Sequence, residues 1–320
     1  MILQILTNAN ILLAGISLIE NLTALDVFTS TRYSGNPVAI VIIPSQYRAS
    51  LTQAQKQAIA TEFNISETVF LHEQDPGAEV IPIDIFTAIA EVPFAGHPTI
   101  GSTFFLLNYP QNKYVKSLLT KAGPIPIFPS DDGKVIAAIP HDIHVHAAKL
   151  VTTISPDIKE ASYPVVSIVK GMTFILASLP DLGGLEKYGT CSLKPGYPYD
   201  PAAGGLMDAG PWCVGFTGTY WYVELPRNDA GRRIFRTRMH ESKEDLATGS
   251  AASALTGWFA LQEEKALGKG PFEYIITQGV EMGRKSVIGV CVTRNESGDE
   301  VKEIMLSGSA VKVMEGAVEV

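Results

Sequence analysis

The stretch Phe94-Ala95-Gly96-His97-Pro98-Thr99-Ile100-Gly101 stands directly in front of an apolar run of helical length, residues 102–107. A second stretch repeats this order far downstream: Glu244-Asp245-Leu246-Ala247-Thr248-Gly249-Ser250-Ala251-Ala252, followed by residues 254–261. A proline fits the first turn of a helix because the N–H that it lacks has no partner there. We therefore predict two helices, the first capped by Gly96 or His97 and the second by Asp245 or Thr248.

The starts of two such helices are suited to bind a small anion. Unpaired amides in the first turn of a helix attract negative charge, and glycine lets a ligand approach the backbone. If Gly96 and Gly249 face each other, they form a pocket for a carboxylate. The alternative is two ordinary capped helices that are buried because they are apolar on every side.

Composition limits the class of protein. A chain of 320 residues is long enough for two domains, and 46% hydrophobic with 18% charged residues is typical of a packed globular protein. The formal charge of -8 argues against a nucleic-acid partner, because binding phosphates requires clustered Lys and Arg. Three widely spaced cysteines give neither a disulfide framework nor a thiol metal site, so we expect a reducing, cytoplasmic location.

The first residues, 1–21, are apolar but carry no Lys or Arg ahead of the apolar part, as a signal peptide would. The run 11–19 is too short to cross a bilayer and contains Gly15. We interpret 1–21 as an N-terminal extension and expect no membrane partner.

The rest of the chain reads twice as strands, then a buried helix with a polar start, then strands. This favours an α+β fold with an internal duplication, in which each half wraps a sheet around one central helix. Residues 183–212 are rich in Gly, Pro and Tyr and read as an irregular insertion. A further helix is expected at 51–62, and strands at 22–28, 38–43, 67–71, 80–86, 135–139, 165–169, 172–179, 221–225, 234–239, 274–277, 286–292 and 311–314.

Five blocks of the chain, in this order, resemble the phenazine-biosynthesis-type (PhzF-like) isomerase family. A further block, Gln278-Gly279 with Gly283-Arg284 and Ser286, is similar to another part of that pattern. The resemblance covers nearly everything after about Leu22. The five blocks are Val27-Phe28-Thr29, Ser34-Gly35-Asn36-Pro37-Val38-Ala39, Ser66-Glu67-Thr68-Val69-Phe70, 94–99 and 244–251.

The resemblance implies the fold of diaminopimelate epimerase: two pseudo-symmetric domains, each with a curved, barrel-like sheet around a central helix, and the site between them. On this basis we divide the chain into an N-terminal half, 22–150, completed by a returning C-terminal strand, 308–320, and a C-terminal half, 151–307. It also implies a homodimer, a small-molecule carboxylate substrate, and neither cofactor nor metal.

The family's best-understood activity isomerises a dihydro-hydroxyanthranilate by moving a proton within the substrate. By resemblance Glu67 is the acid/base, and His97, Asp245 and Ser250 assist it. Backbone amides near Gly96 and Gly249 hold the carboxylate, with Thr248 and Arg284 as further substrate-binding candidates; Arg284 could instead bond an acidic group or tie the second domain together.

Two positions depart from the family pattern. Leu246 stands where the family usually has Pro, which should change only loop stiffness. Asp84 stands where Arg is common, and we expect this to reverse a charge near the site and to put the usual substrate in doubt.

The chemistry is consistent with a cofactor-independent isomerase. Moving a proton on carbon needs a base with a pKa near working pH, and a carboxyl reaches it by losing solvent or by facing another acid. Glu67 lies between Ser66 and the apolar residues 69–71. The alternative for Glu67 alone is an edge-strand carboxylate in water.

Other functions stay open from the residues alone. Thiol-based racemisation is disfavoured, because Ala95 and Thr248 stand where the epimerase branch has its cysteines; an epimerase without thiols remains an alternative. His141, His144 and His146 could hold a metal, although a solvated segment between the halves is the simpler interpretation. A protein that binds small acids or acts as a scaffold without turnover is the non-enzymatic alternative.

Overall fold

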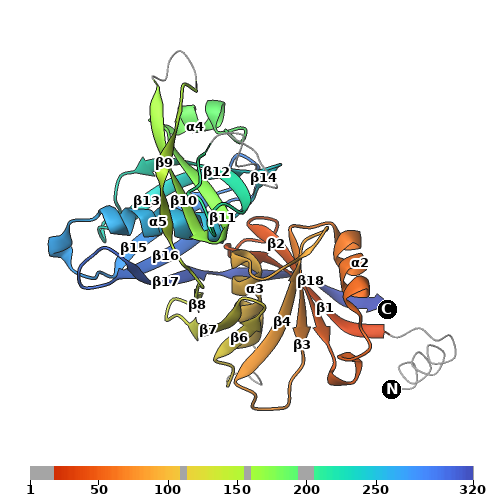
Figure 1. Cartoon of the computed structure of the whole chain (residues 1–320). Coiled ribbons are helices and arrows are strands. Elements are labelled where there is room, and N and C mark those ends of the chain that lie inside the picture. The colour runs from red at the N-terminus through yellow and green to blue at the C-terminus, as the bar shows by residue number, and fades with distance from the viewer. Residues whose placement is uncertain (1–17, 109–113, 155–159, 194–204, 320) are drawn as a thin grey trace, which may run out of the picture.

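The computed structural model describes residues 18–108, 114–154, 160–193 and 205–319. Most of the predicted extension 1–21 lies outside these ranges, and residues 18–21 already belong to the first strand. The chain forms two lobes that meet near the starts of helices α3 and α5 (Figure 1). The N-terminal half forms one lobe and most of the later chain forms the other.

Within the described ranges, four α-helices and eighteen strands build the two lobes. None of these helices combines the length and the apolar character needed to pass through a bilayer. The helices are α2 (Gln53–Phe63), α3 (Gly96–Leu107), α4 (Leu182–Tyr188) and α5 (Gly249–Gln262). The strands are β1 (Leu18–Val27), β2 (Asn36–Ile43), β3 (Glu67–His72), β4 (Val80–Phe86), β5 (Glu91–Val92), β6 (Ser117–Thr120), β7 (Gly123–Pro129), β8 (Val135–Ala138), β9 (His144–Thr152), β10 (Ala161–Val169), β11 (Gly171–Ser178), β12 (Gly215–Leu225), β13 (Arg233–His240), β14 (Glu244–Asp245), β15 (Phe272–Gln278), β16 (Ser286–Arg294), β17 (Val301–Gly308) and β18 (Ala310–Glu319).

The two lobes repeat one pattern of strand pairing. In the first lobe β1 is antiparallel to β2, β2 parallel to β3, β3 antiparallel to β4, β4 parallel to β6, and β6 antiparallel to β7. In the second lobe β10, β11, β12, β13, β15 and β16 follow the same alternation. The two-residue strands β5 and β14 occupy equivalent places, immediately before α3 and α5. This agreement is the structural trace of the predicted duplication.

Strands near the ends of each repeat join the two lobes. β8 pairs with β17, and the last strand, β18, returns to pair with β1. β9 pairs with β10, so the predicted boundary at residue 150 falls inside β9. The β17 and β18 segments run from the second lobe into the first (Figure 1).

Both central helices are enclosed by the sheets because they are apolar on nearly every side. Ile100 and Leu106 of α3, and Leu255 and Ala260 of α5, are buried within one continuous apolar core. Burying each large aliphatic side chain contributes roughly 2 kcal/mol. Helix α2 instead covers the outer face of the first sheet, and Thr52 and Gln55 form its capping box.

Five strands and one α-helix were not predicted, and a further strand lies in a segment that was interpreted as a solvated linker. The prolines of β7 argue against a strand, since proline donates nothing to a ladder, yet β7 pairs on both sides. The predicted insertion 183–212 contains most of α4, and residues 194–204 of it lie outside the described ranges. The segment around His144 and His146 is the start of β9 rather than a solvated linker, with His146 fully buried. The other strands that were not predicted are β5, β6, β14 and β17.

A close backbone contact between the lobes joins the first residues of the two central helices. A Cβ atom added to Gly249 would lie 3.2 Å from Gly96 Cα and 2.9 Å from Leu306 Cδ2. A Cβ at these distances requires the Leu306 side chain to move and the Gly96 backbone to shift by a few tenths of an ångström. Only glycine at both positions therefore lets the helix starts touch.

We predict that Gly249→Ala separates the two helix starts and lowers the free energy of unfolding by about 1–3 kcal/mol, measured by urea denaturation. Gly316→Ala is the control, because a Cβ at this exposed strand position meets nothing within 4 Å. Equal stability of the two variants would contradict the argument.

Candidate active site

The structure places Gly96 and Gly249 side by side, as the family resemblance implied, but the expected caps are only partly right. The residue before α3 is Ala95, so capping by Gly96 or His97 was wrong. Thr248 does occupy the position before α5, yet its side chain does not cap the helix. The Thr248 hydroxyl instead donates a hydrogen bond to Asp245 Oδ2 at 2.6 Å.

Both helices consequently begin without a side-chain cap. The first hydrogen bonds inside the helices run from Thr99 N–H to Ala95 and from Ala252 N–H to Thr248. The backbone N–H groups that precede these have no acceptor within the helix, and they carry the positive end of the helix dipole. Two amide-rich ends thus meet at one place, which is the arrangement that binds a carboxylate.

Glu67 is the first residue of β3, on the sheet face that also carries Val69 and Leu71 and looks toward α3. Its side chain is 18% exposed, and Oε2 lies 3.3 Å from Nδ1 of His97. Within the described part of the chain, neither Glu67 Oε2 nor His97 Nε2 has a hydrogen-bond partner, although both atoms are buried. Buried polar atoms without partners are costly, and in a native protein they are the atoms that a ligand would engage.

Burial changes the ionisation of this pair. Desolvation, reinforced by the nearby Asp245 charge, raises the pKa of Glu67 from 4.5 to about 8, while the Lys243 charge opposes it. Desolvation lowers the pKa of His97 to about 3. At neutral pH Glu67 is therefore mostly protonated, and it lies beside the uncharged imidazole of His97.

Asp245 is the second carboxyl of the site, and it comes from the other lobe. Its Oδ1 accepts a hydrogen bond from Asn36 Nδ2 at 3.2 Å, and its Oδ2 accepts the bond from Thr248. Burial raises the pKa of Asp245, although hydrogen bonds to the carboxylate work in the opposite direction. Two facing acids in a dry site tend to share one proton.

Asn36 is a central residue that the sequence reasoning did not single out. It is fully buried, and Nδ2 lies 3.4 Å from His97 Nδ1 and donates to Asp245 Oδ1 and to the Ala247 carbonyl. Its Oδ1 accepts a hydrogen bond from Ser66 at 3.2 Å. The sequence signal for Asn36 was its place in the block 34–39, which resembles the family pattern. It directly follows Gly35, which has a φ of 67°.

Gln278 was also missed, and it fixes the start of α5. Its Oε1 accepts from the Thr248 N–H at 3.2 Å, and its Nε2 donates to the Asp245 carbonyl at 2.9 Å and to the Thr248 hydroxyl at 3.1 Å. Tyr220 donates to the same Oε1. Gln278 lies at the end of β15, fully buried.

The remaining predicted residues have distinct positions. Ser250 lies in the first turn of α5, nearly buried, beside the amides of the helix start. Arg284 reaches across to the first lobe, where it bonds Asp26 Oδ1 at 2.5 Å and the carbonyls of Ser34 and Gly35. These bonds agree with the predicted role of Arg284 in tying the domains together. Because the guanidinium is used in these bonds, it is less available to bind a substrate.

The expectation that Asp84 reverses a charge near the site was wrong. Asp84 pairs with Phe70 across β3 and β4, on the face covered by α2 and opposite to Glu67. Its carboxylate bonds Lys56 at 2.5 Å and His72 at 2.8 Å. These bonds outweigh desolvation and hold the pKa of Asp84 at about 2.

The histidine segment forms a cluster, but its donor atoms already have partners. His144 Nε2 lies 2.7 Å from Asp208 Oδ2. His146 accepts a bond from the Asp208 N–H at Nδ1 and bonds Ser167 at Nε2. His144, His146 and Asp208 therefore lie close enough together to be metal ligands. Both ring nitrogens of His146, however, already take part in hydrogen bonds.

A cavity of about 790 Å³ lies elsewhere, near the C-terminal end of α3 beside Phe105 and Leu106. Its lining includes none of Glu67, His97, Asn36 and Asp245, so this cavity is separate from the cluster between the lobes.

Comparison with known proteins identifies relatives that span most of the chain. The family model described as "Phenazine biosynthesis-like protein" matches residues 25–163 and 213–316. An uncharacterized isomerase of Mesorhizobium japonicum is 32% identical over 320 residues, covering 93% of this chain and 98% of the relative. The trans-2,3-dihydro-3-hydroxyanthranilate isomerase of Pseudomonas fluorescens is 30% identical over 310 residues, covering 93% and 99%.

Solved structures share the fold at lower identity. A PhzF-family phenazine biosynthesis protein of Bacillus anthracis superposes with a TM-score of 0.65 at 19% identity, covering 95% of this chain and all of the neighbour. A hydroxyproline epimerase of Agrobacterium vitis gives a TM-score of 0.58 at 13% identity, covering 95% and 93%. These likenesses confirm the predicted α+β, epimerase-like fold class.

The ionisation of Glu67 predicts a pH-dependent stability. A carboxyl with a raised folded pKa stabilises the fold fully below 4.5, and this contribution is lost as pH rises toward 8. The free energy of unfolding of Glu67→Gln, relative to the native chain, should thus increase by about 3 kcal/mol between pH 5 and pH 8. Urea titrations at several pH values measure this difference, and a pH-independent difference would show that Glu67 ionises as if in water.

Proposed function

The chain belongs to the phenazine biosynthesis-like (PhzC-PhzF) family and is an isomerase, and within that activity we propose that Glu67 moves a carbon-bound proton in a small carboxylate. One observation carries the proposal most strongly. The buried Glu67 Oε2 has no hydrogen-bond partner among the described residues and lies where two uncapped helix starts meet.

The substrate class follows from the helix starts and from the relatives. The amides near Gly96, Thr248 and Gly249 supply donors for one carboxylate, with the Ser250 hydroxyl beside them. A relative that spans nearly the whole chain bears the name trans-2,3-dihydro-3-hydroxyanthranilate isomerase. We propose a substrate of that kind, a cyclic acid with a carbon–hydrogen bond next to a conjugated double bond.

The proposed step is a redox-neutral proton transfer. Ionised Glu67 takes a proton from carbon, and the electron pair of the broken C–H bond moves into the conjugated system. Glu67, now protonated, returns the proton to another carbon of that system, whose electron pair forms the new C–H bond. Atoms and electrons balance, and Glu67 ends in its starting form.

The neighbouring groups orient this transfer. Neutral His97 lies within 3.3 Å of Glu67 and can hydrogen-bond the substrate through Nε2. Asp245, held by Asn36 and Thr248, faces the pair from the second lobe and makes the Glu67 carboxylate more basic. Position and basicity together supply the catalytic effect.

The resemblance supports further proposals about the setting. We propose that the protein acts as a cytoplasmic homodimer in secondary metabolism, without a cofactor, on a small-molecule partner. An epimerase without thiols is the runner-up reaction. It would invert one carbon rather than move a proton between two.

We predict that Glu67→Gln abolishes the incorporation of solvent deuterium into trans-2,3-dihydro-3-hydroxyanthranilate, followed by NMR and mass spectrometry. Glu91→Gln is the matched control, because Glu91 is similarly covered, with a side chain 13% exposed, and starts β5 at the place equivalent to Glu244. Exchange that survives in Glu67→Gln would refute the role of Glu67. Deuterium confined to an inverted carbon would favour the epimerase.

The pH dependence of kcat/KM should follow the ionisation of Glu67 in the enzyme without bound substrate. Proton removal needs the carboxylate, so kcat/KM should rise with pH and level off above about 8. A steady-state pH profile tests this, and a rate that falls through pH 8 would mean that Glu67 acts first as an acid.

A further inference from the structure

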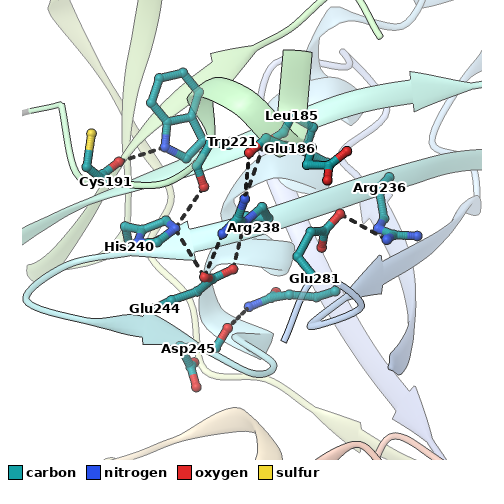
Figure 2. Close-up of polar contacts among 12 residues, drawn as sticks. Leu185, Glu186, Cys191, Trp221, Arg236, Arg238, His240, Glu244, Asp245 and Glu281 are labelled. Atoms are coloured by element: carbon teal, nitrogen blue, oxygen red, sulfur yellow. Dashed lines mark hydrogen bonds and ion pairs between the residues drawn. The ribbon is translucent and has the colours of Figure 1, made fainter. Parts of the chain in front are cut away.

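The pair Glu244-Asp245 forms the two-residue strand β14, whose side chains point to opposite faces of the sheet. Asp245 pairs with Met239 and lies on the inner face, toward Asn36. Glu244 pairs with His240 and lies on the outer face (Figure 2). Whatever fixes Glu244 thus also fixes the backbone that carries Asp245.

Arg238 of β13 holds Glu244 in a bidentate pair. Arg238 Nε lies 2.7 Å from Glu244 Oε1, and Nη2 lies 2.8 Å from Oε2, with both side chains mostly buried. Two parallel bonds between a guanidinium and a carboxylate fix orientation as well as distance. His240 Nε2 lies 3.7 Å from Glu244 Oε2 and donates a hydrogen bond to the Gly189 carbonyl at 2.8 Å.

The same guanidinium is anchored on its far side. Its Nη1 donates to the carbonyls of Leu185 and Glu186 in α4, at 3.4 Å and 3.3 Å (Figure 2). Arg238 therefore joins α4, β13 and β14 into one unit. Lysine could not reproduce this set of bonds, because it lacks the planar fork.

We propose that Arg238 is a positioning residue for the proton transfer, which acts through Glu244 to hold Asp245 against Asn36 and opposite Glu67. This inference rests on the proposed function of Glu67, but it concerns a residue on the other face of the sheet. Arg238 itself reaches neither Glu67 nor the helix starts in any of its hydrogen bonds.

The position of Asp245 has a measurable consequence at Glu67. The charged or titratable groups that face Glu67 are His97 on α3, Asp245 on β14, and Lys243 in the turn before β14. Asp245 raises the pKa of Glu67, and Lys243 lowers it. If β14 loses its anchor, Asp245 moves away and Glu67 should ionise at lower pH.

The same strand offers a matched control. Arg233 of β13 makes an equivalent bidentate pair with Glu224, with Nε 2.7 Å from Oε1 and Nη2 2.8 Å from Oε2. That pair lies at the opposite end of β13, where Glu224 belongs to β12. Replacing Arg233 therefore removes the same kind of interaction without touching β14.

The experiment compares Arg238→Lys and Arg238→Gln with Arg233→Lys and Arg233→Gln in the full chain. The titration of Glu67 is followed by NMR of ¹³C-labelled glutamate side chains without any ligand, and Glu67→Gln identifies the signal. We expect Arg238→Gln to lower the Glu67 midpoint by about one pH unit, Arg238→Lys to lower it less, and both Arg233 variants to leave it unchanged. For trans-2,3-dihydro-3-hydroxyanthranilate, kcat should fall about 10- to 100-fold in Arg238→Gln, with a much smaller change in KM.

An unchanged Glu67 midpoint in folded Arg238→Gln, or an equal change in Arg233→Gln, would overturn the inference. Arg238→Lys keeps the charge, so a change there reports lost geometry rather than lost charge. The titration of Glu67 is measured without ligand, so its result does not depend on whether the protein turns over the substrate. If Glu67→Gln retained deuterium exchange, the proposed function would fail while the titration still decided the role of Arg238.

Discussion

The backbone contact between Gly96 and Gly249 is the constraint from which the rest of the site follows. Neither residue has a side chain, so the starts of two buried helices come within van der Waals contact. Neither helix start is capped by a side chain, so both positive ends and their unpaired amides lie together. Hydrogen bonds around this contact join the two lobes. Asn36 of the first lobe bonds Asp245 and Ala247 of the second, and Arg284 of the second lobe bonds Asp26 of the first.

Exclusion of water sets the chemistry at this contact. Desolvation is the largest influence on Glu67, His97 and Asp245, and in each case it favours the uncharged form. Hydrogen bonds from Asn36 and Thr248 stabilise the ionised form of Asp245. Glu67, in contrast, has an oxygen without a hydrogen-bond partner among the described residues. The pair is therefore asymmetric, with one carboxyl held in place and the other available to a ligand.

The sequence predicted the features that arise from local pattern. Periodicity located the two central helices and most strands, and the repeated polar starts indicated the duplication. Glu67, His97, Asp245 and Ser250 were identified by resemblance, and the structure gathers them where the lobes meet. Local pattern alone could not show that segments so far apart in sequence touch.

The features that were missed depend on which face of a sheet a residue occupies or on distant pairing. Asp84 was expected near the site, but strand alternation puts it on the α2 side with Lys56. Asn36 and Gln278 are polar residues at strand ends, and only the assembled lobes make them central. The prolines of β7 disguised a strand that has partners on both sides.

The return of β18 to β1 also affects how the chain can be assembled during synthesis. Val27 faces Ala310 in this pairing, so β1 gains its second neighbour only after the ribosome has synthesised the chain as far as β18. Until then one edge of the nascent first lobe stays open, and open edges invite pairing with other chains. Strand β18 therefore covers this edge only late in synthesis. Contacts this distant in sequence are also expected to form slowly.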